Sequence, residues 1–166
     1  NSYIGYLSSI PGNSFRGYKI GLDCANGASS TIAKNVFTML GADTYVISDL
    51  PDGKNINRGC GSTHIEALQN FVVGEGLDIG FAFDGDADRC IAVNEKGEIM
   101  DGDSIIYIIA TMLKEQDKLT GNKAVITVMS NLGLINALKA NGIENILALR
   151  GDLNPDIPPV NEFEHA

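Results

Sequence analysis

The sequence predicts an α/β fold: a mostly parallel sheet flanked by helices in αβα layers, with a β-hairpin after an acidic loop. Three observations predict it. Short apolar segments alternate along the chain with segments of helical periodicity, as in sheets whose strands are connected by covering helices. The segment 78–83 is short and apolar, which is typical of a strand buried on both faces. A tight turn at 94–97 separates two further short apolar segments, which is the pattern of a hairpin.

The first two strands enclose a helix. Strands are predicted at 18–23 and 44–47, and a helix capped by Ser29 or Ser30 is expected between them. The apolar side chains of this helix fall on one face, and Gly41 follows as a stop. These apolar residues are Ile32, Ala33, Val36, Phe37 and Leu40.

The second helix is predicted by a capping-box pattern. The Thr63 hydroxyl is placed to accept from the Glu66 amide, while the Glu66 carboxylate reaches back to the Thr63 amide. The helix is expected to end near Gly74 or Gly76, and the strand 78–83 follows it. Its apolar residues are Ile65, Leu68 and Val72.

A hairpin and a long helix come next. The hairpin strands are expected at 90–93 and 98–100. A helix capped by Asp101 or Asp103 then runs up to a break at 120–122. The apolar residues at helical spacing in this helix are Ile105, Ile106, Ile109, Met112 and Leu113.

The two ends of the chain are less regular. A strand at 124–128 and a helix at 132–141 form a further unit, and periodicity leaves open whether it extends the same sheet or begins a new domain. Residues 1–17 are weakly patterned and are expected to lead in from a missing upstream domain. The segment 154–159 has no helical or strand pattern, and residues 147–166 are expected to form a non-family or disordered tail.

Composition and charge narrow the function. The 166 residues are 44% hydrophobic and 20% charged, which suits a globular protein. The formal net charge of −9 argues against a nucleic-acid or anionic-membrane partner, because both attract basic surfaces. No apolar run approaches the roughly 20 residues of a membrane-spanning helix, and no signal peptide is evident. The odd cysteine number, without metal-binding spacing, predicts reduced thiols in a cytoplasmic protein: Cys24, Cys60 and Cys90.

The acidic segment carries the strongest functional signal. Asp84, Asp86 and Asp88 alternate with small residues directly after a predicted strand, where ligands gather in α/β sheets. Three such carboxylates repel one another unless a cation lies among them, and their hard oxygens favour Mg²⁺, Mn²⁺ or Ca²⁺ over zinc. The adjacent Arg89 could offset the remaining negative charge or hold a phosphate.

Three interpretations of this segment compete. They are a solvated acidic turn, a calcium loop of the EF-hand type, and a catalytic Mg²⁺ site for phosphoryl transfer. The EF-hand interpretation conflicts with Arg89 at the sixth position, where that loop requires glycine, and with the flanking predicted strands. An apolar strand directly before the segment disfavours a solvated turn. The pattern therefore favours the phosphoryl-transfer site.

Other polar positions give weaker signals. The loop 23–30 could cradle a phosphate at a helix start, but the missing glycine pattern of nucleotide sites favours a packing role. His64 lies in a predicted helix start and Ser130 follows a strand, and the sequence indicates no partner for catalysis by either. Asp101 and Asp103 suit helix capping better than metal binding.

Several motifs together resemble a known family. The segment Asp84-Gly85-Asp86-Ala87-Asp88-Arg89 resembles the metal-binding loop of the α-D-phosphohexomutases. The resemblance narrows to one branch, the bacterial phosphoglucosamine mutases, and it covers roughly residues 17–146. The stretches that narrow it are 23–28, 57–64, 89–93, 100–103 and 128–133.

The resemblance implies an activity and a site. Members of this branch interconvert glucosamine 6-phosphate and glucosamine 1-phosphate through a bisphosphorylated sugar, with an enzyme phosphoserine as phosphoryl donor. It implies that Asp84, Asp86 and Asp88 bind Mg²⁺ and that Arg89 is a catalytic residue supporting the phosphoryl group. It also implies that residues 18–120 are the family's second domain. Residues 121–146 would then be the first strand and helix of its third domain.

The sequence also departs from the family. It has no Thr-Ala-Ser-His-Asn-Pro-like nucleophile segment, no Gly-Glu-Gln-Ser-Gly-His-like sugar loop and no phosphate-binding loop of a fourth domain. The expected partners are therefore the remaining mutase domains, and a hexosamine phosphate in the full enzyme. The chain alone is expected to be inactive, with residues 147–166 outside the family. The alternative is a non-enzymatic α/β module that binds metal or a partner surface.

Overall fold

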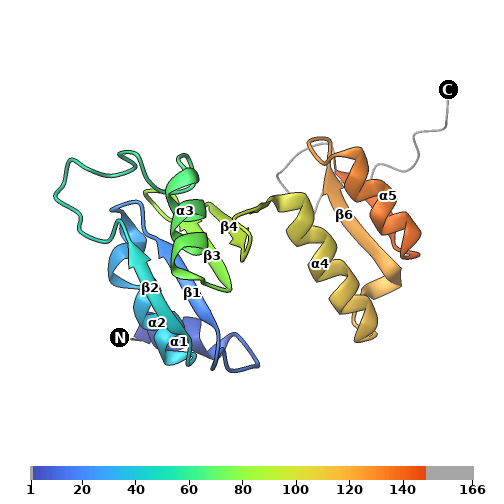
Figure 1. The fold of residues 1–166 in the computed structure, drawn as a ribbon. Coiled ribbons are helices and arrows are strands. Elements are labelled where there is room, and N and C mark those ends of the chain that lie inside the picture. Colours follow the sequence, from blue (N-terminus) through green and yellow to red (C-terminus); the bar gives the residue numbers. More distant parts are fainter. Residues whose placement is uncertain (1, 149–166) are drawn as a thin grey trace. The chain divides into compact units, whose positions relative to one another are not determined.

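The protein divides into two compact units along its chain. The computed structural model describes residues 2–148, and the first unit ends at Asp101 while the second begins at Gly102. Figure 1 shows the elements of each unit. None of the helices among residues 2–148 is long and apolar enough to cross a membrane.

The first unit contains a mixed five-stranded sheet in the order β2-β1-β3-β4-β5. The strands are β1 (Lys19–Asp23), β2 (Asp43–Ile47), β3 (Ile79–Phe83), β4 (Cys90–Asn94) and β5 (Ile99–Met100). β1 pairs in parallel with β2 and β3, whereas β3–β4 and β4–β5 are antiparallel. The expectation of a mostly parallel sheet is therefore correct for one half only. The connection from β3 to β4 is too short for the crossover that parallel pairing needs.

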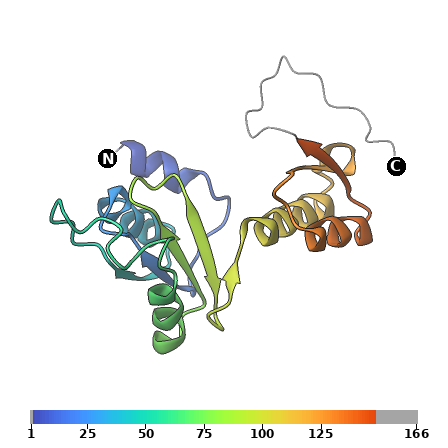
Figure 2. The same cartoon turned by 90° about the horizontal axis from the view of Figure 1, so that it is seen from above.

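Helices cover both faces of this sheet. They are α1 (Ser2–Ser9), the 3₁₀ turn η1 (Ala28–Thr31), α2 (Ala33–Met39) and α3 (Glu66–Glu75). One core lies between α2 and the sheet and includes Leu22 and Phe37. The other lies under α3 and includes Leu68 and Val93. Figure 2 shows α1 and the green helix α3 on opposite sides of the sheet. The αβα layering was thus predicted correctly.

Both predicted caps in this unit are wrong. Ser29 lies inside η1, and its hydroxyl donates to the Cys24 carbonyl at 3.2 Å rather than capping a helix. α3 begins at Glu66, so this residue takes the first helical position instead of the third that a capping box requires. At the other end the prediction is confirmed, because Gly76 closes α3 in the left-handed conformation with φ 60°.

The start of the chain is more regular than its sequence suggests. Residues Ser2–Ser9 of the expected lead-in form α1, which packs beside α2. The segment after it is anchored as well, because the Phe15 amide donates to the Leu40 carbonyl at 2.8 Å. These residues belong to the first compact unit.

The second unit is a smaller α/β assembly. It contains α4 (Gly102–Glu115), η2 (Thr120–Asn122), β6 (Lys123–Thr127), α5 (Leu132–Ala140) and β7 (Glu144–Ala148). β6 and β7 pair in parallel, and α4 shares a core with β6 and α5 through Ala110, Ile126 and Leu138. The unit boundary therefore lies at 101/102 rather than after residue 120, because the buried side of α4 packs on this core.

The end of the described chain also differs from expectation. β7 was not predicted, and its last two residues, Leu147 and Ala148, fall in the segment expected to be a disordered tail. The rest of that predicted tail, 149–166, lies outside the described residues. α5 begins as predicted, with the Asn131 side chain accepting from the Leu134 amide at 2.9 Å.

Candidate metal centre

The acidic loop connects the antiparallel strands β3 and β4. It leaves the carboxyl end of β3 at Asp84 and enters β4 at Cys90. The loop after β1 reaches it, because the Ala28 amide donates to the Gly85 carbonyl at 2.9 Å. The segment before α3 reaches it too, since the Ser62 amide donates to the Phe83 carbonyl at 2.9 Å. Three loops therefore meet where the parallel strands end, as expected for a ligand site in an α/β sheet.

The structure brings the three predicted aspartates together. Each of Asp84, Asp86 and Asp88 offers a carboxylate oxygen within 4.8 Å of the others. Among residues 2–148, no other group of three carboxylate, imidazole or thiol side chains meets this criterion. Asp84 is 1% exposed, whereas Asp86 and Asp88 face solvent. The site therefore has one fixed carboxylate and two accessible ones.

The backbone of the loop is fixed by Asp84 and Arg89. The Ala87 amide donates to the Asp84 carbonyl at 3.1 Å, and the Arg89 amide donates to Asp84 Oδ1 at 3.0 Å. Ala87 adopts φ 62°, a left-handed conformation that is costly for a residue with a Cβ atom. These contacts tighten the loop and bring the alternate aspartates to one side.

Arg89 also neutralises part of the acidic cluster. Its Nε lies 2.7 Å from Asp84 Oδ2 and 3.6 Å from Asp88 Oδ1. The backbone and side-chain hydrogen bonds from Arg89 lower the pKa of Asp84, while repulsion from Asp86 and Asp84 raises the pKa of Asp88. The two carboxyls differ because Arg89 contacts Asp84 directly and Asp88 faces its acidic neighbours.

This geometry excludes one of the three interpretations of the loop and disfavours another. Strands flank it on both sides, β3 and β4, so the helix-loop-helix context of an EF-hand is ruled out. A buried, doubly hydrogen-bonded Asp84 is unlike a solvated turn. The oxygen donors suit a hard divalent cation such as Mg²⁺.

Close backbone packing supports the loop from one side. A Cβ atom at Gly27 would lie 2.3 Å from the Gly85 carbonyl oxygen, so only glycine fits there. The loop 24–28 therefore packs directly against the acidic loop. This contact supports the packing interpretation of the loop after β1, whose η1 turn is only four residues long.

The other sequence candidates lie outside the acidic cluster. His64 is exposed and its amide donates to the Gly61 carbonyl at 3.0 Å. Ser130 belongs to the second unit. Asp103, within α4, accepts from the Asn131 amide at 2.7 Å, and Asp101 directly precedes α4.

The cysteines are free thiols, with Cys24 and Cys60 buried and Cys90 exposed. Burial raises the pKa of Cys24 to about 11, which disfavours the thiolate needed for nucleophilic catalysis.

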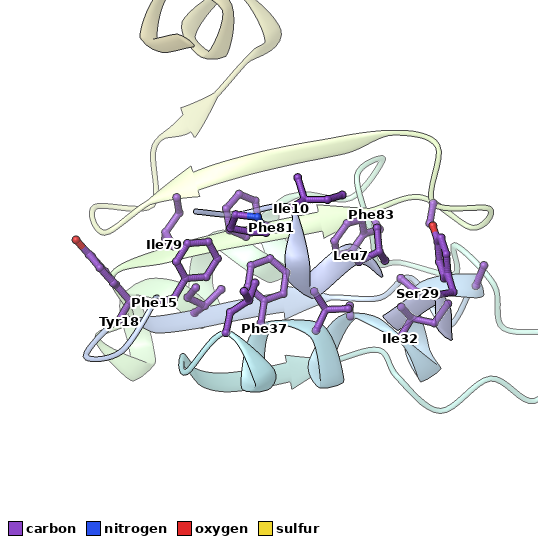
Figure 3. Close-up of a pocket in the computed structure, with 18 of the residues that line it drawn as sticks. Leu7, Ile10, Phe15, Tyr18, Ser29, Ile32, Phe37, Ile79, Phe81 and Phe83 are labelled. Carbon is purple, nitrogen blue, oxygen red and sulfur yellow. The ribbon is translucent and has the colours of Figure 1, made fainter. Parts of the chain in front are cut away.

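A cavity of about 960 Å³ lies beside the acidic loop (Figure 3). It is bounded by α1, α2 and the sheet, and its labelled lining side chains are mainly aromatic and aliphatic, among them Phe15, Phe37 and Phe81. Asp86 and Ala87 lie at its border. A sugar phosphate needs many hydrogen-bond donors, so this apolar cavity does not suit such a ligand.

The fold and the site define an α/β domain with a carboxylate cluster at the end of a central strand. Comparison then places it: the chain belongs to the phosphoglucomutase/phosphomannomutase family. The sequence profile of that family's alpha/beta/alpha domain II matches residues 1–97, and that of its domain III matches residues 101–154. The division between the two profiles agrees with the unit boundary in the structure.

Individual relatives show which branch of the family the chain resembles. The chain is 60% identical over 144 residues to the phosphoglucosamine mutase of Lachnospira eligens, covering 87% of this chain and 32% of the relative. It is 57% identical over 150 residues to that of Lachnoclostridium phytofermentans, covering 90% and 34%. The chain is thus a phosphoglucosamine mutase homologue that spans about a third of the length of these curated relatives.

Solved structures share the fold. A phosphoglucomutase/phosphomannomutase family protein from Burkholderia thailandensis superposes with a TM-score of 0.76 at 25% identity, covering 90% of this chain and 33% of that one. An N-acetylglucosamine-phosphate mutase of the alpha-D-phosphohexomutase superfamily, in the apo form, superposes with a TM-score of 0.63 at 18% identity, covering 90% and 36%. The second likeness concerns the fold alone.

Proposed function

We propose that this chain supplies the metal-binding domain of a phosphoglucosamine mutase, with Asp84, Asp86 and Asp88 as ligands of Mg²⁺. The observation that carries the proposal is the convergence of the three carboxylates within 4.8 Å at the end of β3. The 60% identity to a phosphoglucosamine mutase supports it. The proposed reaction is the interconversion of glucosamine 6-phosphate and glucosamine 1-phosphate.

The residues present fit the proposed ion. Three carboxylates carry a charge of −3, so a divalent cation leaves −1 near the guanidinium of Arg89. When bound, Mg²⁺ would draw negative charge from the oxygens of a phosphoryl group. Arg89 is 71% exposed, so its remaining N–H groups are available to donate to a phosphoryl oxygen. Asp84 meanwhile holds the loop in shape through its bonds to Arg89.

The rest of the reaction is proposed to depend on other domains. Transfer through an enzyme phosphoserine and a bisphosphorylated sugar requires a serine nucleophile and sugar-binding loops, and this sequence lacks segments resembling them. We therefore propose that the 166-residue chain alone does not catalyse the interconversion. Turnover of glucosamine 6-phosphate by the purified chain would contradict this part.

A titration with Mg²⁺ followed by amide NMR tests the metal site. The amides of residues 84–89 should shift on addition of Mg²⁺, and Asp86→Asn should weaken or abolish the response. A hexose 1,6-bisphosphate added to the Mg²⁺-loaded chain should shift the same loop further. An unchanged spectrum at millimolar Mg²⁺, with the fold intact, would remove the support for a metal site in this chain.

The same titration distinguishes the alternative, a non-enzymatic module that binds metal or a partner surface. Such a module would respond to Mg²⁺ without a further response to the bisphosphate. The loop's similarity to the phosphohexomutase metal loop and the identity to phosphoglucosamine mutases favour the enzymatic proposal.

A further inference from the structure

A buried aspartate outside the acidic loop joins the two segments that support it. Asp23 is the last residue of β1 and its side chain is fully buried. Its Oδ1 accepts from the Ala25 amide at 2.9 Å, and its Oδ2 accepts from the Gly61 amide at 2.8 Å. Both carboxylate oxygens are therefore used, one by the loop after β1 and one by the segment before α3.

Both of these segments bond the acidic loop on either side of Asp84. From the first, the Ala28 amide donates to the Gly85 carbonyl at 2.9 Å. From the second, the Ser62 amide donates to the Phe83 carbonyl at 2.9 Å. Asp23 thus bonds the two segments whose amides in turn donate to the carbonyls of residues 83 and 85.

The packing around this carboxylate leaves little room for rearrangement. A Cβ atom at Gly61 would lie 2.6 Å from both the Ala25 Cβ and the Phe83 carbonyl oxygen. The two segments also bond each other, because the Asn57 amide donates to the Ala25 carbonyl at 2.9 Å. A shift of either segment is therefore transmitted to the acidic loop through close contacts.

We propose that Asp23 is a positioning residue for the metal centre, which holds Asp84 in place by clamping the loop 24–28 to the segment 57–62. This inference rests on the proposed Mg²⁺ site. A carboxylate suits the role because it accepts two backbone N–H bonds at once. An asparagine would turn one acceptor into a donor facing an N–H group. Residues behind the ligands of a metal commonly tune its affinity in this way.

Comparison of Asp23→Asn with Asp78→Asn in the full chain tests the inference. Asp78 is the control, because its exposed side chain also accepts a backbone N–H bond: its Oδ2 accepts from the Lys19 amide at 2.7 Å, at the opposite end of β1. Mg²⁺ affinity is measured by calorimetry and stability by urea unfolding. Both variants should unfold at lower urea concentration. Only Asp23→Asn should weaken Mg²⁺ binding, by about 10-fold or more.

The outcomes distinguish a failure of this inference from a failure of the proposed Mg²⁺ site on which it rests. Equal Mg²⁺ affinity in folded Asp23→Asn, Asp78→Asn and the unchanged chain would overturn the positioning role and leave the metal site standing. Failure of the unchanged chain to bind Mg²⁺ would overturn the proposed site and the inference with it.

A second measurement needs no variant, so it decides the matter even where Asp23→Asn does not fold. Coupling between sites is reciprocal. Mg²⁺ should therefore slow hydrogen exchange at the Ala25 and Gly61 amides of the unchanged chain more than at the Lys19 amide. Equal effects at the three amides would contradict the inference.

Discussion

Arg89 engages both carboxylate oxygens of Asp84: its backbone amide lies 3.0 Å from Oδ1 and its Nε 2.7 Å from Oδ2. The carboxylate proposed as the buried metal ligand is thus already paired with a cation. This arrangement satisfies an aspartate that is 1% exposed, since burial of an unpaired carboxylate is costly. It also sets the guanidinium of Arg89 in competition with a metal ion for Oδ2.

Replacement of Arg89 should reveal this competition. In Arg89→Gln the Mg²⁺ affinity should rise, because a positive charge beside three carboxylates is removed and Oδ2 of Asp84 is released. The gain should be modest, about 3-fold to 10-fold, because solvent screens a side chain that is 71% exposed. Calorimetry with Arg16→Gln, which removes a charge near the other end of β1, provides the control. Unchanged or weaker binding in Arg89→Gln would mean that the two cations do not compete.

The carboxyls of the cluster should titrate in a defined order. The pKa of Asp88 is raised, mainly by repulsion from Asp86, and the pKa of Asp84 is lowered, mainly by the Arg89 backbone hydrogen bond. As pH falls without metal, Asp88 should therefore take up its proton before Asp84 does. Carbon-13 NMR of the side-chain carboxyls measures both, and Asp86→Asn should move the titration of Asp88 to lower pH.

The effects on stability have opposite signs. The lowered pKa of Asp84 stabilises the fold at pH values above the ordinary aspartate range, and this contribution is lost as pH falls through its folded pKa. The raised pKa of Asp88 means that the folded chain holds this proton more tightly than the unfolded chain does. Protonation of Asp88 therefore favours folding. If Asp84 and Asp88 took up their protons at the same pH, the repulsion assigned to Asp88 would be contradicted.

A methyl group at Gly27 should disturb the acidic loop directly. In Gly27→Ala the new Cβ would meet the Gly85 carbonyl oxygen at 2.3 Å, so one of the two loops must move. The expected cost is about 1–3 kcal/mol in the free energy of unfolding, with weaker Mg²⁺ binding. Gly27 has φ −116°, which alanine tolerates, so the effect would come from the clash alone.

Gly74→Ala is the matched control for this variant. Gly74 lies within α3, and nothing lies within 4 Å of a Cβ added there. It should stabilise the chain by roughly 0.5–1 kcal/mol, because alanine favours a helix over glycine, and it should leave Mg²⁺ binding unchanged. Normal stability and metal binding in Gly27→Ala would show that the loop contact is dispensable.

Local pattern predicted the site better than it predicted the sheet. The alternation of Asp84, Asp86 and Asp88 after an apolar strand was sufficient to anticipate their convergence, because neighbouring residues in a short loop cannot lie far apart. The antiparallel direction of β4 follows from the shortness of the same loop. The predicted serine and threonine caps were wrong for local reasons: Ser29 lies inside η1 and bonds the carbonyl of Cys24, and α3 begins too late for Thr63 to cap it.

The long-range contacts that support the acidic loop could not be predicted from the sequence. Asp23 and Gly61 are 38 residues apart in the chain, and nothing in the local pattern of either indicates the other. The domain boundary was misplaced for a similar reason. The helical pattern of α4 shows that one face is buried, but not which unit provides the core.

The position of that boundary can be tested with two shortened chains, one ending at residue 101 and one ending at residue 120. The chain 1–101 should fold and bind Mg²⁺ as the full chain does, because the cores under α2 and α3 lie entirely within it. The chain 1–120 adds α4 without the core formed by β6 and α5. It should therefore expose Ile106 and Ala110 and bind an apolar dye more strongly. Amide spectra measure folding and dye fluorescence measures exposure. An unfolded 1–101 beside a well-folded 1–120 would instead assign α4 to the first unit.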